Sequence, residues 1–361
     1  MDTEPHINAT VVNQSDELMS TRQDLYEELD IHQKSDHRKG VLNAIGGVSL
    51  MFFLGCFYLW GNISIYVLSY FYEFNPDIDL GFIFIVDTLL IVANTCGYNI
   101  GTFLLNYVRL NPRLIVAMGG GFALTGVFLS SFTKSLGPYL ACYTGMNGIG
   151  CGTCYMVPLV CAWEYFPEKK GLMTGIIIGA YGFGSFGFSL ISTALVNPTG
   201  ADPTIEDGDL TFFDASVADR VPYMIRTLVY IWICFVTIGV LLISRKPKER
   251  VELAVKRLKE QKALEDLSVP TQDSEEIIDR IVVDKYEIKA FWYCFYSKRF
   301  WQYFTIMVCG NFFATFFSYT YKAYGEDSAL HKPISDTTLT WAASIGGGLV
   351  NGCSRLCMGT L

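Results

Sequence analysis

Long apolar segments separated by short polar ones dominate the chain. Most of the charge lies in residues 1–40, 197–220 and 245–299, and the stretches between them carry almost none. A hydrocarbon core about 30 Å thick needs about 20 helical residues to cross it. Because a backbone in lipid must satisfy its own hydrogen bonds, apolar runs of that length predict membrane-spanning helices. Eight segments qualify: 45–70, 82–107, 113–132, 137–163, 171–195, 222–244, 300–322 and 338–361.

The pattern therefore predicts an all-α, polytopic membrane helix bundle with about eight transmembrane helices. A charged stretch separates the first six spans from the last two, which is the layout of a two-bundle transporter. The predicted parts are a cytoplasmic N-terminal tail at 1–40, a six-helix bundle at 41–245, a cytoplasmic linker at 246–299 and a partial second bundle of two helices at 300–361.

The basic residues predict the orientation of the bundle, because Lys and Arg gather in cytoplasmic loops. Lys34, Arg38 and Lys39 precede the first span, whereas the loop at 197–220 carries six acidic residues against Arg220 alone. Every second loop is basic, which places the N-terminus in the cytoplasm of a multi-pass protein. Plasma and organellar membranes both remain open.

Composition narrows the possible functions. Only 17% of the residues are charged and the mean hydropathy is +0.31, whereas soluble proteins carry about 25% charged residues. No basic patch is interleaved with aromatic residues, so no nucleic-acid partner is expected. The pair Cys151-x-x-Cys154 has no second pair or nearby His, so neither a metal nor a cofactor is expected. Catalytic motifs such as Gly-x-Ser-x-Gly, His-Glu-x-x-His or a phosphate loop do not occur, which argues against an enzyme.

Glycines recur at helical spacing in spans four and five. Gly148 and Gly152 lie four residues apart, as do Gly171 and Gly175. Small residues on one face let helix backbones approach closely in lipid, where packing joins helices. With a short turn at Pro167 between the two spans, the pattern predicts a tight helical hairpin.

The same region carries the most specific motif. Residues 143–185 read YTGMNGIGCGTCYMVPLVCAWEYFPEKKGLMTGIIIGAYGFGS. This stretch resembles spans four and five of the oxalate/formate antiporter-like and monocarboxylate transporter-like branch of the major facilitator superfamily. Residues 54–61 and 351–355 resemble that family's first and eighth spans. The resemblance implies a secondary active transporter of mono- or dicarboxylates, working by alternating access with a proton or a counter-anion. Family members have twelve spans, so the sequence is interpreted as a fragment or as a reduced transporter.

Arg355 is the main substrate-binding candidate. The resemblance implies that it pairs with the substrate carboxylate, for which a guanidinium fork offers two parallel N–H donors. An Arg within a span costs about 2.5–3.5 kcal/mol on insertion scales, which favours a functional reason for it. The alternative is an Arg that extends to the interface near the end of the span. Asn351, one helical turn earlier, is expected to hold Arg355 in place.

Aromatic and acidic residues within the spans are further candidates. Tyr58, Trp60 and Tyr155 match regions that line the family's cavity, and their polar groups suit a small anion. The alternative for each is packing or an interfacial belt. Asp87 lies several residues into span two, with Asn94 on the same face. It is either a proton or cation relay or part of a structural polar stripe.

The loop between spans two and three departs from the family pattern. Arg109 and Arg113 match the gate loop, but Val108 stands where the family has Asp and Asn111 where it has Gly. This difference predicts a weakened or altered gate. Glu164, near the end of span four, is expected to pair with Arg113 or with the lysines that follow that span.

Two hypotheses remain. The leading one is a transporter of small organic anions within the lipid bilayer. The rival is a transport-inactive membrane subunit or scaffold derived from the same family, held in a larger membrane complex.

Overall fold

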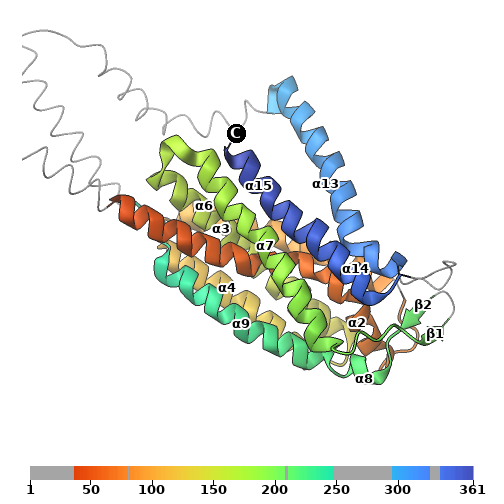
Figure 1. Ribbon diagram of the computed structural model, residues 1–361. Coiled ribbons are helices and arrows are strands. Elements are labelled where there is room, and N and C mark those ends of the chain that lie inside the picture. Colours follow the sequence, from red (N-terminus) through yellow and green to blue (C-terminus); the bar gives the residue numbers. More distant parts are fainter. Residues whose placement is uncertain (1–35, 80, 208–209, 247–294, 326–333, 361) are drawn as a thin grey trace, which may run out of the picture. The chain divides into compact units, whose positions relative to one another are not determined.

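A computed structural model describes residues 36–79, 81–207, 210–246, 295–325 and 334–360 of the chain (Figure 1). The chain forms two units, one holding Met1–Lys246 with Gly325–Leu361 and the other Pro247–Tyr324. The described part of the second unit is dominated by a single helix, α13 (Lys298–Gly325). Most of the predicted N-terminal tail and linker lie outside the described residues, so the predicted domain boundaries stay predictions.

The first unit is a bundle of long helices. Its first helix begins at Asp36, tightens into the short 3₁₀ segment η1 and continues as α2 to Tyr72. Helix α4 shows how local sequence sets a boundary, because Asn111 accepts a hydrogen bond from the Arg113 N–H (3.0 Å) and Pro112 fills the first helical position. The elements are η1 (Gly55–Leu59), α2 (Trp60–Tyr72), α3 (Gly81–Asn106), α4 (Pro112–Ser130), α5 (Leu136–Tyr139), the π-helical η2 (Leu140–Met146), α6 (Asn147–Tyr165), η3 (Pro167–Lys169), α7 (Lys170–Val196), β1 (Ile205–Asp207), β2 (Leu210–Phe212), α8 (Ala215–Ala218), α9 (Val221–Leu242), α14 (Asp336–Ala343), the π-helical η5 (Ser344–Val350) and α15 (Asn351–Thr360).

The predicted all-α membrane bundle is confirmed. Five helices in the described part of the chain are long and apolar enough to cross a membrane: Asp36–Tyr72, Gly81–Asn106, Pro112–Ser130, Pro167–Val196 and Ala215–Leu242. The other three predicted spans are also helical, as α5–η2–α6, α13 and α14–η5–α15. They carry more polar residues, among them Asn147, Asp336 and Arg355.

The described residues include one small antiparallel hairpin among the helices. Strands β1 and β2 pair Ile205 with Phe212, and the Phe212 ring stacks on Tyr72 at 4.1 Å. The N–H of Phe213 donates to the Ser69 hydroxyl at 2.9 Å. The hairpin therefore covers the end of α2. We call this end of the bundle the hairpin end.

The glycine faces pack closely, but not against each other as the predicted hairpin required. Gly152 of α6 meets α3, where an added Cβ would overlap the Asn94 carbonyl oxygen. Gly175 of α7 meets α15 instead, and its added Cβ would lie 2.8 Å from the Gly359 Cα. Close approach needs small residues on both helices, and α3 and α15 supply them. The prediction of close packing is confirmed, and the predicted pairing of α6 with α7 through these faces is wrong.

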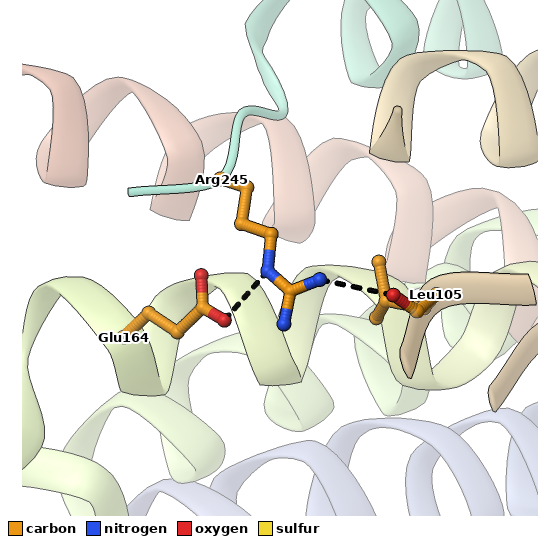
Figure 2. A network of polar contacts seen from close by, with 3 residues as sticks. All are labelled: Leu105, Glu164 and Arg245. Atoms are coloured by element: carbon orange, nitrogen blue, oxygen red, sulfur yellow. Dashed lines mark hydrogen bonds and ion pairs between the residues drawn. The ribbon is translucent and has the colours of Figure 1, made fainter. Parts of the chain in front are cut away.

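A short extended segment closes the opposite end of the bundle (Figure 2). Residues 243–246 follow α9 and cross the ends of four other helices; we call them the strap. Arg245 donates through Nε to Glu164 Oε1 at 2.7 Å and through Nη1 to the Leu105 carbonyl at 2.9 Å. Arg113 Nε donates to the Ile243 carbonyl at 3.0 Å. The predicted pairing of Glu164 with Arg113 or the nearby lysines is therefore wrong, because the strap brings Arg245 to Glu164 and occupies Arg113.

The glycine contacts predict a position-specific cost. Gly152→Ala should lower the free energy of unfolding by about 1–3 kcal/mol, as overpacking does. Gly121→Ala is the matched control, because nothing lies within 4 Å of its added Cβ. It should leave stability unchanged or raise it by up to about 1 kcal/mol, since Ala favours helix over Gly. Unfolding in mixed micelles measures both, and equal effects at the two positions would refute this packing.

The strap predicts a second contrast. Arg245→Gln should cost about 1–3 kcal/mol, because it leaves the partly buried Glu164 carboxylate without its cation. Lys246→Gln is the control, since Lys246 Nζ lies 3.8 Å from Asp36 and both side chains are 29% exposed. Its loss should cost less than about 1 kcal/mol. Thermal unfolding in detergent compares the two, and a Lys246 effect as large as that of Arg245 would contradict the account.

Candidate functional site

Arg355 points into the bundle from α15. Its Nε donates to Asn351 Oδ1, one helical turn earlier, at 2.6 Å. Its guanidinium carbon lies 5.9 Å from the centre of the Tyr181 ring on α7. Side chains of a helix lean toward its N-terminus, and Asn351 holds Arg355 in that direction. An Arg that extended to the nearby interface would point the other way, toward Thr360.

Four tyrosines, each from a different element of the bundle, lie in a chain beside this guanidinium. Tyr58 meets Tyr181 edge-on with ring centres 5.2 Å apart, and Tyr155 lies 6.1 Å from Tyr181. Tyr98 of α3 follows at 5.0 Å from Tyr155. The Tyr155 hydroxyl is close enough to Arg355 to interact with it. The sequence reasoning singled out Tyr58 and Tyr155 and missed Tyr181, whose place in the glycine-rich α7 gave no separate signal.

A cavity of about 500 Å³ lies beside Arg355 between α7 and α15. The close contact of Gly171 and Gly175 of α7 with Gly359 of α15 forms part of its wall. Its lining residues are Trp163, Lys170, Gly171, Thr174, Gly175, Ile178, Arg355, Met358 and Gly359. The cavity is on the side of the strap. A space of this volume is large enough to admit a small organic anion.

Two other candidates lie elsewhere. Trp60 is fully buried, and its indole N–H donates to the Ile83 carbonyl at 3.2 Å, so its donor is already used in packing α2 on α3. Asp87 lies eleven residues before Tyr98 on α3, about 16 Å along the helix axis. Its Oδ1 and that of Asn94 are buried without hydrogen-bond partners among the described residues. Neither Trp60 nor Asp87 joins the Arg355 cluster in the described contacts.

The two gate-loop residues, Arg109 and Arg113, have different surroundings in the structure. Arg113 bonds to the strap, as described above. Arg109 is exposed and adopts a left-handed backbone conformation with φ of 56° between α3 and α4. Non-Gly residues adopt this conformation rarely, so the turn is sharp. The loop thus belongs to the strap end of the first six helices, and its part in gating stays a prediction.

Parts of this chain are similar in sequence to known proteins. Apicoplast pyruvate carrier 1 of Toxoplasma gondii is 25% identical over 179 residues, which cover 40% of this chain and 33% of that protein. Monocarboxylate transporter 12-B of Danio rerio is 31% identical over 156 residues, 40% of this chain and 31% of the relative. The oxalate:formate antiporter of Oxalobacter formigenes is 33% identical over 76 residues, 21% of this chain and 18% of the relative. The chain thus matches about a third or less of each relative's length.

The family match is much broader than these pairwise ones. The family model described as the Major Facilitator Superfamily matches residues 44–361, from the first helix to the end of the chain. The matched region includes the five apolar helices and the cluster around Arg355. Both the helical architecture and the sequence match agree, and this multi-pass membrane protein belongs to the major facilitator superfamily.

Proposed function

We propose that this protein is a secondary transporter that moves small organic anions bearing a carboxylate, by alternating access. Membership of a transporter superfamily supports transport over catalysis. The names of the three relatives concern pyruvate, monocarboxylates, and oxalate with formate. All of these are small carboxylates. The observation that carries the proposal is the direction of Arg355, which points into the bundle beside a cavity.

The geometry of Arg355 suits one carboxylate. Asn351 accepts from Nε, so the terminal nitrogens are the groups that the Tyr155 hydroxyl and a ligand can reach. Terminal nitrogens can donate two parallel hydrogen bonds to the two oxygens of a carboxylate. The Tyr155 hydroxyl beside them adds a neutral donor. A cation inside a membrane protein needs an anionic partner, and in this proposal the substrate is that partner.

We propose that transport of the substrate is coupled to the movement of a second anion and not to a proton carried by Asn351. An amide does not take up or release protons in the physiological range, so Asn351 orients Arg355 without being a proton carrier. With the N-terminus in the cytoplasm, as the basic loops indicate, the cavity beside Arg355 is on the cytoplasmic side. After the substrate is released, a second anion could bind to the site, and the loaded site would return to face the side where the substrate first bound.

Uptake by the full chain in proteoliposomes tests the proposal. We expect uptake of labelled pyruvate, formate or oxalate, and Arg355→Lys should lower kcat/KM by about 10- to 100-fold. A lost charge-assisted hydrogen bond costs about 1.5–3 kcal/mol, and about 1.4 kcal/mol is tenfold. Arg226→Lys is the control, because Arg226 lies on α9 with its Nε on the Pro222 carbonyl. Uptake of none of these anions, or equal loss in both variants, would overturn the proposal.

Asn351 gives a second expectation. Asn351→Ala should raise KM by about 10- to 100-fold with little change in kcat, because a hydrogen bond to a charged group is worth about 1.5–3 kcal/mol. Ser354→Ala is the control, since its hydroxyl bonds only to the Asn351 backbone carbonyl in the described contacts (2.9 Å). Uptake kinetics at several substrate concentrations separate the two constants. A change confined to kcat would argue against a positioning role for Asn351.

A further inference from the structure

A second buried polar cluster lies at the hairpin end, away from Arg355. Asp336, the first residue of α14, has no exposed surface. Its carboxylate accepts from the Tyr66 hydroxyl, with the two oxygens 2.8 and 2.6 Å away. The Asn197 side-chain amide at the end of α7 donates to the same carboxylate at 3.1 Å. One carboxylate thus joins α14 to α2 and to α7.

A neighbouring layer repeats the connection one turn further along α14. The Thr340 hydroxyl donates to Asn62 Oδ1 on α2 at 3.1 Å. The Asn62 amide donates in turn to α7, at the Ser189 carbonyl (3.1 Å) and the Thr193 hydroxyl (2.9 Å). Asn62 and Thr340 are each only 2% exposed. Two stacked layers therefore hold the same three helices.

These bonds cross a contact in which glycines meet the facing backbone and a few larger side chains, among them Phe183, Phe186 and Leu356. Below the polar layers, an added Cβ at Gly348 would lie 2.7 Å from the Phe186 Cα, and one at Gly182 would lie 2.7 Å from the Gly352 Cα. We call this contact of α7 with η5 and α15 the glycine seam. The glycines let the two backbones approach closely along this seam, so the contact depends on close packing and not on a large apolar core. The cavity beside Arg355 lies at the other end of the same seam.

The polar layers suit a joint that opens and closes. In the closed state the carboxylate has protein donors, and a hydrogen bond to a charged group contributes more than a neutral one. In an open state water can replace those donors, because the cluster is beside the extramembrane hairpin. The difference between the two states is therefore modest, unlike the loss of a sealed apolar core.

We propose that Asp336, Tyr66, Asn197, Asn62 and Thr340 form a latch that holds α14 against α2 and α7 at the hairpin end. When the latch opens, α7 separates from η5 and α15 along the glycine seam, beginning at the hairpin end. The Arg355 site then becomes accessible from the hairpin side. The functional consequence rests on the proposed transport activity. The latch itself is a statement about conformational opening, which can be measured without any substrate.

Hydrogen exchange of the full chain in lipid nanodiscs tests the latch. Tyr66→Phe removes only the hydroxyl, and Asp336→Asn keeps the side chain's shape. Each should raise the exchange rate of segments 60–72, 189–202 and 334–345 by about fivefold or more. The reason is that losing a hydrogen bond worth about 1 kcal/mol raises the population of the open state about fivefold. The segment 147–165, on α6, should not change. Exchange raised equally in all segments would mean general destabilisation and would overturn the proposal.

A matched control lies one turn along α2. The Tyr70 hydroxyl donates to the Thr133 carbonyl at 3.5 Å, outside the latch, so Tyr70→Phe should leave the three segments unchanged. The double variant Tyr66→Phe/Asp336→Asn should exchange no faster than Asp336→Asn within twofold, because both changes act on one contact. Unchanged exchange in both single variants would refute the latch whatever the transport assay shows. If the single variants show the expected faster exchange but the protein takes up none of the anions, the transport proposal alone would be refuted.

Discussion

The constraint on which this structure depends is the absence of water around its helices. Each helix satisfies its own backbone, and the surrounding lipid gives no hydrophobic reason for two helices to meet. Close packing at glycines and a few polar contacts must therefore hold the bundle together. Gly152 against α3 and Gly175 against α15 supply the close packing. Polar contacts at the two ends of the bundle and around Arg355 add to this packing.

These three polar places have different partners and so different consequences. In the described contacts, the strap connects helices of the first six spans, through Arg245, Glu164 and Arg113. The cluster at Asp336 connects those spans to α14. Arg355 of α15 faces Tyr181 of α7 and is one of the residues that line a cavity between these helices. In the proposed alternating access, the first bundle would move against α14 and α15 at the latch, with Arg355 between them.

Local patterns in the sequence predicted the local features of the structure. Apolar length located the helices, Asn111-Pro112 marks the start of α4, and the four-residue spacing of Asn351 and Arg355 matches their hydrogen bond. Glycine spacing indicated close packing correctly. It could not identify the partner helices, because a face of small residues fits any other such face. The tight pairing of spans four and five was wrong for that reason.

Contacts between distant segments were beyond sequence reasoning. Glu164 and Arg245 are 81 positions apart, and Tyr66 and Asp336 are 270 apart. Asp336 falls before the predicted start of the last span and looks like an ordinary loop acid. Asn62 lies in an Asn-x-Ser pattern that has no evident role within a span. Trp60 resembled a cavity residue by position, but its donor is used by a neighbouring backbone carbonyl.

The central claim is that a single guanidinium at the glycine seam recognises a carboxylate. The most direct measurement compares the binding of pyruvate with that of its neutral amide to the purified chain in nanodiscs, by ligand-observed NMR. The account predicts that the carboxylate binds at least about tenfold more tightly, because the amide cannot accept two charge-assisted bonds from Arg355. It also predicts that this preference disappears in Arg355→Gln. Equal binding of the two ligands, or an unchanged preference in the variant, would contradict it.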